Sequence, residues 1–283
     1  MNMHQPSAER TPVYFVSHGG PTLLDDSAYP PDEPIARGLR RIGDEIRSLR
    51  PRGMVVISGH WESERPSSLQ VNGKSSAMPL IYDFYNFPAW MYQESFEHHA
   101  DPLLARKVAD IVAAHNIQID VVDRGLDHGV WVVSKKAGLA QADFPIIQLS
   151  LFANESMEDH IKLGQALQPL REQGIVVVGS GMAVHNLRDL FGSRSSPSDG
   201  IRSYVIPFDK EIELALDSTH SAEQRCEAVA ALAYSANLRS AHPTLEHLLP
   251  LHVAVGAAGH VTTVEKLVEA YQASLSWSCY RFL

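Results

Sequence analysis

The chain has 283 residues and a formal net charge of −9 at pH 7, and 45% of its residues are hydrophobic. These values are typical of a globular protein with room for one large α/β domain or two small ones. The acidic balance argues against nucleic-acid binding, because no basic stripe is available to neutralise phosphates. No apolar run approaches the ~20 residues that a membrane-spanning helix needs. The 14 histidines and two cysteines predict that any metal site consists of imidazole and carboxylate groups.

The beginning of the chain lacks the basic and then apolar pattern of a secretory signal, so we expect a cytoplasmic protein. Residues 1–11 predict a flexible N-terminal arm, and residues 12–283 predict a single domain. Residues 192–203 are rich in Ser, Gly and Pro, which indicates an exposed loop within that domain.

Short apolar runs rich in β-branched residues alternate with helical patterns along the chain. The predicted strands are Val13–Ser17, Met54–Ser58, Ile117–Val122, Ile146–Leu151 and Ile175–Gly179. The predicted helices are Pro34–Leu49, Pro102–His115, Ser156–Gln173, Ser221–Ala236 and Thr244–Ala258. Two later runs, Val261–Val264 and Ser274–Phe282, indicate antiparallel edge strands. This alternation predicts an α/β fold with a central, mostly parallel or mixed sheet flanked by helices.

Four histidines follow predicted strands or tight turns: His18, His60, His128 and His185. Ligands of open α/β sheets bind beyond the carboxyl ends of the strands, so these side chains could converge on one crevice. A set of two or three imidazoles leaves open positions on a metal ion, as in catalytic centres, and a further histidine can act as an acid or base. One histidine beside a glycine turn is more often a capping residue, but four at equivalent positions favour a site.

The predicted helix Thr244–Ala258 contains Glu246, His247 and His252 among apolar residues. A buried Glu or His needs a partner, and either a metal ion or an ordinary hydrogen bond would supply one. His252 lies on a different face from His247, which suggests a packing or pocket-lining role. We expect the remaining histidines, including His160, to lie mainly at the surface.

A dense aromatic cluster lies between residues 82 and 92, where polar residues interrupt the aromatic ones. Such a cluster is equally consistent with a hydrophobic core and with a loop that covers an aromatic pocket. We expect the substrate-binding residues to be Tyr82, Phe84, Trp131 and His252.

The chain also resembles a known family through motifs that follow one another over nearly its whole length. They are Ser17-His18-Gly19-Gly20-Pro21, Ser58-Gly59-His60-Trp61, Tyr82-Asp83-Phe84-Tyr85-Asn86-Phe87-Pro88, Leu126-Asp127-His128-Gly129-Val130-Trp131, Pro145-Ile146-Ile147-Gln148-Leu149-Ser150, Gly179-Ser180-Gly181 through His185-Asn186-Leu187, and His242-Pro243-Thr244 through Leu251. In these motifs the sequence resembles the class III extradiol ring-cleavage dioxygenases (LigB superfamily), in particular the DOPA 4,5-dioxygenase-type branch.

The resemblance implies one non-haem Fe(II) centre, and related structures often hold zinc in the same site. It implies His18 and His60 as metal ligands and matches the third ligand to His247. Glu246 stays open as an alternative, because other branches place a glutamate in this region. Many relatives have Ser where Gly20 stands, and this departure leaves the metal site unaffected.

The resemblance also implies two acid–base residues. His185 matches the base of the family, although in some members it lies close enough to the metal to be a ligand. His128 matches a second active-site histidine, which would act as an acid or on the oxygen side of the site.

The function implied is the opening of a catecholic ring by O₂, outside the diol, to a muconic semialdehyde-type product. The partners would be a small catechol and O₂, with no nucleic acid or membrane, and the protein would be a monomer or a small homo-oligomer. Two alternatives remain open at this point. One is a zinc-dependent hydrolase that uses the same histidines, and the other is a non-catalytic metal-binding protein of the same fold.

Overall fold

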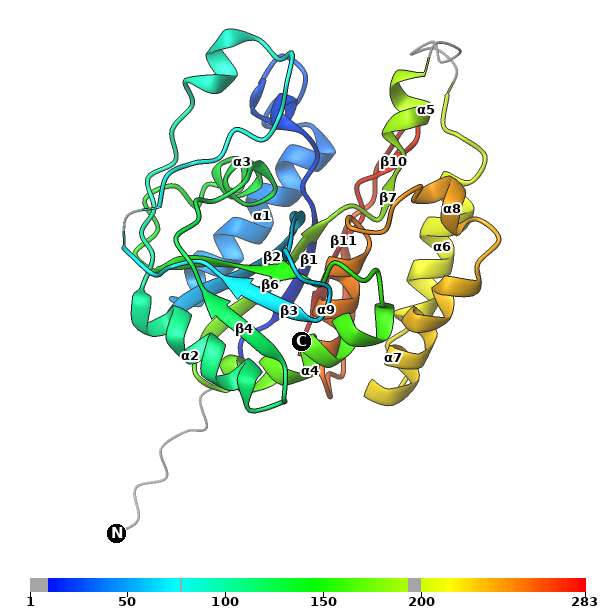
Figure 1. The fold of residues 1–283 in the computed structure, drawn as a ribbon. Coiled ribbons are helices and arrows are strands. Elements are labelled where there is room, and N and C mark those ends of the chain that lie inside the picture. The colour runs from blue at the N-terminus through cyan, green and yellow to red at the C-terminus, as the bar shows by residue number, and fades with distance from the viewer. Residues whose placement is uncertain (1–9, 77, 193–199) are drawn as a thin grey trace.

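The computed structural model describes residues 10–76, 78–192 and 200–283, which form an α/β domain around a mixed eight-stranded sheet (Figure 1). The strand order is β4-β3-β5-β2-β6-β1-β11-β8, and a small second sheet has the order β7-β10-β9. The strands are β1 (Val13–Ser17), β2 (Gly53–Glu62), β3 (Ser68–Val71), β4 (Gln118–Val121), β5 (Ile146–Leu151), β6 (Ile175–Gly181), β7 (Val184–His185), β8 (Val264–Val268), β9 (Tyr271–Gln272), β10 (Leu275–Ser276) and β11 (Cys279–Phe282).

Helices cover both faces of the large sheet. They are α1 (Pro34–Ser48), α2 (Pro102–Ala113), α3 (His128–Lys136), α4 (Met157–Glu172), α5 (Leu187–Phe191), α6 (Val205–Ala215), α7 (Ala222–Ala230), α8 (Leu238–Ala241) and α9 (Leu249–Ala258), with short 3₁₀ turns at η1 (Pro21–Leu24), η2 (Ala89–Tyr92) and η3 (Ala231–Tyr234). One face packs against α1 and α3, and the other packs against α2, α4 and α9. Helices α6 and α7 lie beyond α9 (Figure 1).

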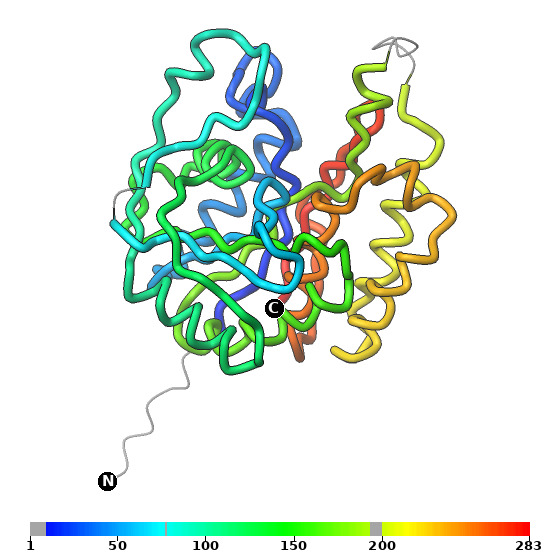
Figure 2. Tube along the Cα trace, viewed as in Figure 1, coloured from blue at the N-terminus to red at the C-terminus, as the bar shows by residue number. Residues whose placement is uncertain are grey.

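Strand β1 shows how the sequence fits these two layers. Val13 and Phe15 belong to the core under α4 and α9, whereas Tyr14 and Val16 belong to the core under α1 and α3. Successive side chains of a strand point to opposite faces of the sheet, so a strand covered on both faces is apolar at every position. The last strand lies beside the first, because β11 pairs antiparallel with β1, as the red and blue segments of Figure 2 show.

The five predicted strands and the mixed α/β class are confirmed. Strand β2 pairs in parallel with β5 and β6, and β6 pairs in parallel with β1. The two late segments do form antiparallel strands, and β8 (Val264–Val268 rather than Val261–Val264) lies at the edge of the sheet. The second is not an edge strand in the large sheet, because β11 pairs with both β1 and β8. The prediction missed β3, α3 and α6. These elements are short or lack a clear apolar period.

The helix caps suggested by the sequence are present at α4 and α7. Ser156 Oγ accepts a hydrogen bond from the Asp159 amide at 3.1 Å, and Ser221 and Gln224 form a reciprocal capping box. Gly174 follows α4 with a φ of +75°, a conformation that strongly favours glycine.

The helix predicted to span Thr244–Ala258 begins only at Leu249, so that prediction was wrong at its start. Pro250 occupies the first turn of α9. Backbone N–H groups in a first turn have no partner within the helix, so the N–H that proline lacks costs no hydrogen bond there. Glu246 and His247 therefore lie in the segment that leads into the helix rather than on its surface.

Thr11, the last residue of the expected arm, is held by the domain. Thr11 is buried, and its hydroxyl donates to the Ile175 carbonyl at 2.6 Å. Residues 1–9 of the arm and residues 193–199 of the expected loop lie outside the described residues. Among the described residues, no helix is long and apolar enough to cross a membrane.

His160 is buried, which corrects its expected place at the surface. Its Nε2 accepts the Phe152 amide hydrogen at 3.1 Å, and its Nδ1 donates to the Ser156 carbonyl at 2.6 Å. Burial lowers the pKa of this imidazole to about 4, because a proton on Nε2 would be desolvated and would break the bond to Phe152.

The metal-free protein should therefore lose stability as the pH falls from 6.5 toward 4. In this window the unfolded state protonates His160 while the folded state does not, so the free energy of unfolding should fall by about 1.4 kcal/mol per pH unit for this group alone. Urea unfolding at pH 7.5, 6.0 and 5.0 measures the effect. The His160→Gln variant should show a shallower pH dependence, and an identical slope in both proteins would contradict this role.

Candidate active site

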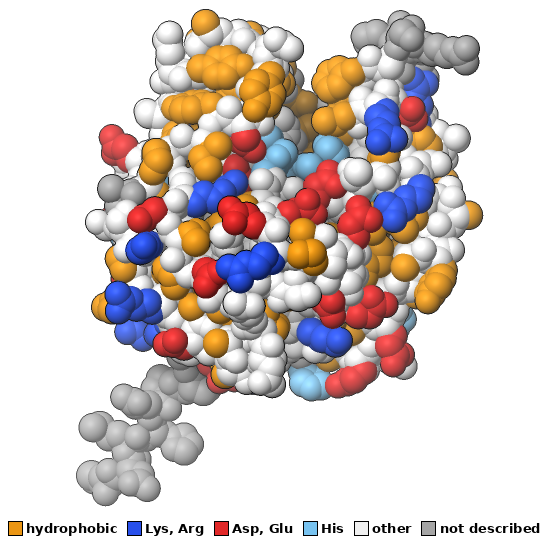
Figure 3. All heavy atoms as spheres, viewed as in Figure 1, with side chains coloured by type: hydrophobic (Ala, Val, Ile, Leu, Met, Phe, Trp, Pro, Cys, Tyr) orange, Lys and Arg blue, Asp and Glu red, His pale blue; other side chains and the backbone are white. Residues whose placement is uncertain are grey.

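Five histidines from distant parts of the sequence meet at the carboxyl ends of the parallel strands. His18 follows β1, His60 lies near the end of β2, and His185 ends β7 just after β6. His128 is the first residue of α3, and His247 lies two residues before α9. Figure 3 shows histidine atoms at the bottom of a cleft with apolar side chains on both rims. The expected convergence on one crevice is therefore confirmed.

Three of these rings point the same nitrogen at one another. The Nε2 atom of His60 lies 3.1 Å from Nε2 of His18 and 3.2 Å from Nε2 of His247. His18 and His247 are almost completely buried, and their ring centroids are 5.2 Å apart. Burial lowers the pKa of all three imidazoles, so the rings are neutral at pH 7.

The opposite nitrogen of each ring faces a hydrogen-bond acceptor. His247 Nδ1 lies 2.9 Å from Glu246 Oε1, and His60 Nδ1 lies 3.4 Å from Asp83 Oδ2. His18 Nδ1 lies 3.0 Å from the hydroxyl of Ser180, which donates its own hydrogen to a backbone carbonyl. Because an ionised carboxylate can only accept, these contacts place the proton of each ring on Nδ1.

Three Nε2 lone pairs therefore converge. Because none of the three Nε2 atoms carries a hydrogen, the lone pairs repel one another unless a cation binds between them. Imidazole nitrogens bind zinc at about 2.0–2.1 Å, so two ligands of one ion are separated by about the distances found here. The donor set of His18, His60 and His247 thus fits a divalent transition metal, and imidazole suits both iron and zinc.

Glu246 takes a supporting position in this arrangement. Its carboxylate contacts Nδ1 of His247, on the far side of the ring from the three Nε2 atoms. Carboxylates placed in this way orient a ligating histidine and increase its basicity. The geometry thus favours His247 over Glu246 as the third ligand, although His185, Glu246 and His247 also lie close enough together to share an ion.

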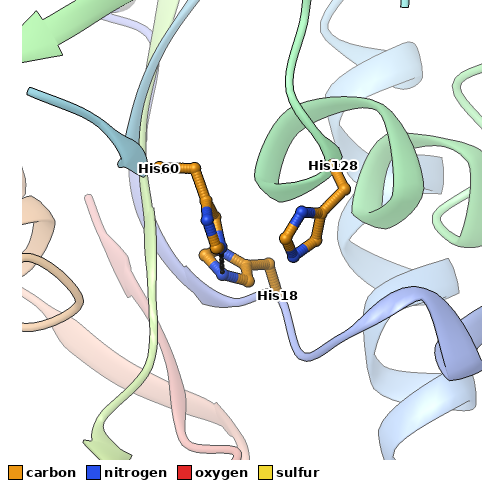
Figure 4. A group of neighbouring side chains, drawn as sticks. All are labelled: His18, His60 and His128. Carbon is orange, nitrogen blue, oxygen red and sulfur yellow. Dashed lines mark hydrogen bonds between the residues drawn. The ribbon is translucent and has the colours of Figure 1, made fainter. Parts of the chain in front are cut away.

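His128 lies beside His18 and His60 and is also close enough to share an ion with them (Figure 4). Its ring is tilted against that of His60, with centroids 3.9 Å apart at an interplanar angle of 49°. The Nε2 contacts at 3.1 and 3.2 Å join His60 to His18 and His247. Nδ1 of His128 instead lies 2.9 Å from the Asp83 carboxylate. This arrangement is compatible with an acid–base role for His128 as well as with a place among the metal-binding residues.

Asp83 joins His128 to His60. Its Oδ1 lies 2.9 Å from Nδ1 of His128 and also accepts the backbone N–H of His128 at 2.9 Å. Burial acts to raise the pKa of this carboxyl group, but the hydrogen bonds and charges of His128 and His60 outweigh it and lower the pKa to about 2. Asp83 is therefore ionised throughout the physiological range.

His185 stacks on His247. Its ring centroid lies 3.7 Å from that of His247, and the two planes differ by 18°. Burial, followed by the nearby His128, lowers the pKa of His185 to about 4, so its imidazole is neutral and able to accept a proton at pH 7. Strand pairing of His185 with Leu275 fixes its backbone.

A buried polar network supports the site from behind. The Asp127 carboxylate is fully buried and accepts the Ser58 hydroxyl hydrogen at 2.8 Å, and Arg124 lies 3.2 Å from its other oxygen. The Arg124 guanidinium also stacks over Trp61 at 4.3 Å. This network connects β2, which carries His60, to the start of α3, which carries His128.

The four expected substrate-binding residues separate into two groups. Phe84 packs edge-on against His128 at 5.8 Å, and Tyr82 supports it from 6.0 Å. Trp131 and His252 are fully buried. Trp131 donates to the Ile81 carbonyl, and both nitrogens of His252 face backbone carbonyls near the α7–α9 contact. The structure does not bring these last two residues to the cleft.

The sequence reasoning missed the residues that hold the rings in place: Asp83, Ser180, Ser58, Asp127 and Arg124. Asp83 and Asp127 do carry a signal, since each is an isolated acidic residue inside one of the histidine or aromatic motifs. Ser58 and Ser180 carry a weaker one, as polar residues at the ends of otherwise apolar strands.

The chain is similar to known proteins over nearly its whole length. The family model described as the catalytic LigB subunit of aromatic ring-opening dioxygenase matches residues 12–282. The chain is 35% identical over 277 residues to 4,5-DOPA dioxygenase extradiol of Beta vulgaris, covering 95% of this chain and 96% of the relative. It is 32% identical over 278 residues to the protein of the same name from Portulaca grandiflora, covering 95% and 94%.

A solved structure shares the fold of this chain. The crystal structure of an uncharacterized protein, JW3007, from Escherichia coli K12 aligns with a TM-score of 0.74 at 28% identity, covering 96% of this chain and 99% of that one. The chain therefore belongs to the LigB family of aromatic ring-opening dioxygenases.

Proposed function

We propose that this protein is a non-haem Fe(II)-dependent extradiol dioxygenase that opens a catecholic ring with O₂ to a muconic semialdehyde-type product. The convergence of three Nε2 lone pairs from His18, His60 and His247 carries the proposal. Three imidazoles leave coordination positions open, as a centre that gathers two small reactants requires. The curated relatives named 4,5-DOPA dioxygenase extradiol support a catechol as the substrate.

The metal would supply Lewis acidity and hold the catechol and O₂ close together. The remaining chemistry belongs to the protein. His185, whose ring is neutral and stacked on His247, would accept a proton from a catechol hydroxyl. His128 would move a proton on the other side of the site, where the Asp83 carboxylate at its Nδ1 stabilises the charge on the ring.

The cleft itself favours a flat aromatic guest. Phe84 lies edge-on to His128, and Tyr82 and Tyr92 pack around Phe84. Apolar side chains on both rims of the cleft extend this surface toward solvent (Figure 3). Aromatic rings pack well against such edges, and a buried apolar wall excludes water from the reacting centre.

The proposal is tested by loading the protein with Fe(II) without oxygen, adding a panel of catechols and then admitting air. A yellow semialdehyde product should appear together with O₂ consumption. The proposal would be refuted if protein that is shown to contain iron forms no ring-opened product from any catechol of the panel.

Repeating the assay with zinc in place of Fe(II) distinguishes the dioxygenase from a hydrolase and from a non-catalytic metal-binding protein. Zinc-loaded protein should bind catechols but yield no ring-opened product. Turnover of hydrolysable esters or amides by zinc-loaded protein without O₂ would instead support a hydrolase. Tight metal binding with neither activity would support a binding protein, although such a protein would have no need of the acid–base pair His128 and His185.

A further inference from the structure

One carboxylate, that of Asp83, lies close to the Nδ1 atoms of two of the active-site histidines. Its Oδ2 lies 3.4 Å from Nδ1 of His60, and its Oδ1 lies 2.9 Å from Nδ1 of His128. The side chain of Asp83 is 23% exposed, and its carboxylate also accepts the backbone N–H of His128. Asp83 therefore touches a proposed metal ligand and a proposed acid–base residue at once.

This contact decides where each ring carries its hydrogen. The Nδ1 contact of His128 with this carboxylate lacks hydrogen-bond geometry, so it is the short distances that bear on the tautomers. An ionised carboxylate repels a nitrogen lone pair and attracts an N–H group, so a neutral ring whose Nδ1 lies this close to it carries its hydrogen on Nδ1. Nε2 of His60 then has a lone pair to direct at the partner nitrogens of His18 and His247, 3.1 and 3.2 Å away. Nε2 of His128 is likewise left free to take up a proton.

The backbone of Asp83 also links these rings to the aromatic wall. Its neighbours in the chain are Tyr82 and Phe84, and Phe84 packs against His128. The backbone N–H of His128 donates to the same carboxylate at 2.9 Å, which holds the first turn of α3 against this segment. A displacement of the aromatic segment would consequently move the acceptor shared by both rings.

We propose that Asp83 is a positioning residue that fixes the tautomers of His60 and His128 together, so that both rings direct an Nε2 lone pair into the cleft. The effect on the tautomers stands on the contacts alone, whereas the effect on turnover rests on the proposed function. Asp83 acts through the two histidines and is assigned no contact with the substrate.

The Asp83→Asn variant tests this most sharply, because the shapes of the two side chains match. An amide offers one acceptor oxygen and one donor nitrogen, so it can satisfy Nδ1–H of only one ring. The other ring should move its hydrogen to Nε2. We expect zinc affinity or kcat at saturating metal to fall by about 10- to 100-fold, as for other carboxylates that orient ligating histidines.

The measurement is nitrogen NMR of zinc-loaded protein labelled in its histidines, which distinguishes Nδ1–H from Nε2–H rings. It also works where turnover is absent, so failure of the dioxygenase proposal would leave this test intact. The unmodified protein should show Nδ1–H on both His60 and His128. An Nε2–H tautomer for His128 in the unmodified protein would overturn the proposal without any variant.

Two comparisons separate positioning from general stability. Glu94→Gln removes an acidic group from the same segment, where Glu94 pairs with Lys135. This variant should change neither the tautomers of His60 and His128 nor the zinc affinity. In a double-mutant cycle, Asp83→Asn and His128→Gln should lower kcat less than additively, because they remove the same function. Unchanged tautomers and zinc affinity in Asp83→Asn would refute the role.

Discussion

Replacing His18 with alanine should abolish metal binding and turnover together, whereas replacing His185 should abolish turnover and leave the metal bound. His18 contributes one of the three converging Nε2 atoms, so its loss leaves two ligands and an open cavity. His185 instead stacks its ring on that of His247 and would act on the substrate proton. Metal content after anaerobic Fe(II) loading and gel filtration, measured beside kcat, distinguishes the two variants.

The same experiment settles the place of His128, which also lies within reach of His18 and His60. His128→Ala should retain the metal and lose most of its turnover. His260→Ala is the matched control, because the side chain of His260 is 79% exposed, and this variant should match the unmodified protein. Metal loss in His185→Ala or His128→Ala equal to that in His18→Ala would make that residue a ligand.

The second large effect is expected at Gly129, the residue after His128. A Cβ atom at this position would lie 2.5 Å from Ser58 Oγ, 2.9 Å from the His60 ring and 3.1 Å from the His18 ring. His18 and His60 are proposed metal ligands, and Ser58 belongs to the hydrogen-bond network behind them. An added methyl group would therefore displace a proposed ligand or a residue that positions one. We expect Gly129→Ala to weaken Fe(II) affinity by about 10- to 100-fold, in the range found when ligand orientation is disturbed.

Gly20→Ala provides the control for this prediction. Gly20 also lies next to the site, two residues after His18, but a Cβ atom there would meet nothing within 4 Å. Its φ of −97° is open to any residue. Competition with a metal-binding dye should therefore show wild-type affinity for Gly20→Ala. Equal affinities for the two variants would show that crowding at Gly129 does not position the ligands.

The central features of this site could be predicted from sequence because they depend on strand ends. Buried parallel strands are apolar at every position, so the points at which they stop are visible, and His18 and His60 lie at two of them. Parallel strands end at the same edge of the sheet, which is why the histidines that follow them converge.

Features that depend on side-chain burial could not be predicted in the same way. His160 was expected at the surface, yet its two nitrogens match one donor and one acceptor that only the fold brings together. Trp131 and His252 were expected in the pocket, but apolar packing covers both completely. A sequence pattern shows which residues avoid water but not which of them reach a cleft.

The role of Asp83 illustrates a further limit. Its contacts join residues 23 and 45 positions away in the chain, and no period or spacing connects an acidic residue in an irregular segment to a strand end and a helix start. His247 shows the same limit, because its position depends on where Pro250 allows α9 to begin.

The most direct test of the account is the incorporation of labelled oxygen. Protein loaded with Fe(II) should convert a catechol under ¹⁸O₂ into a ring-opened product that contains both labelled atoms, with the mass measured before the aldehyde exchanges with water. Zinc-loaded protein should yield none of this product. A product that carries oxygen only from water, formed equally well with zinc, would contradict the assignment of a ring-opening dioxygenase.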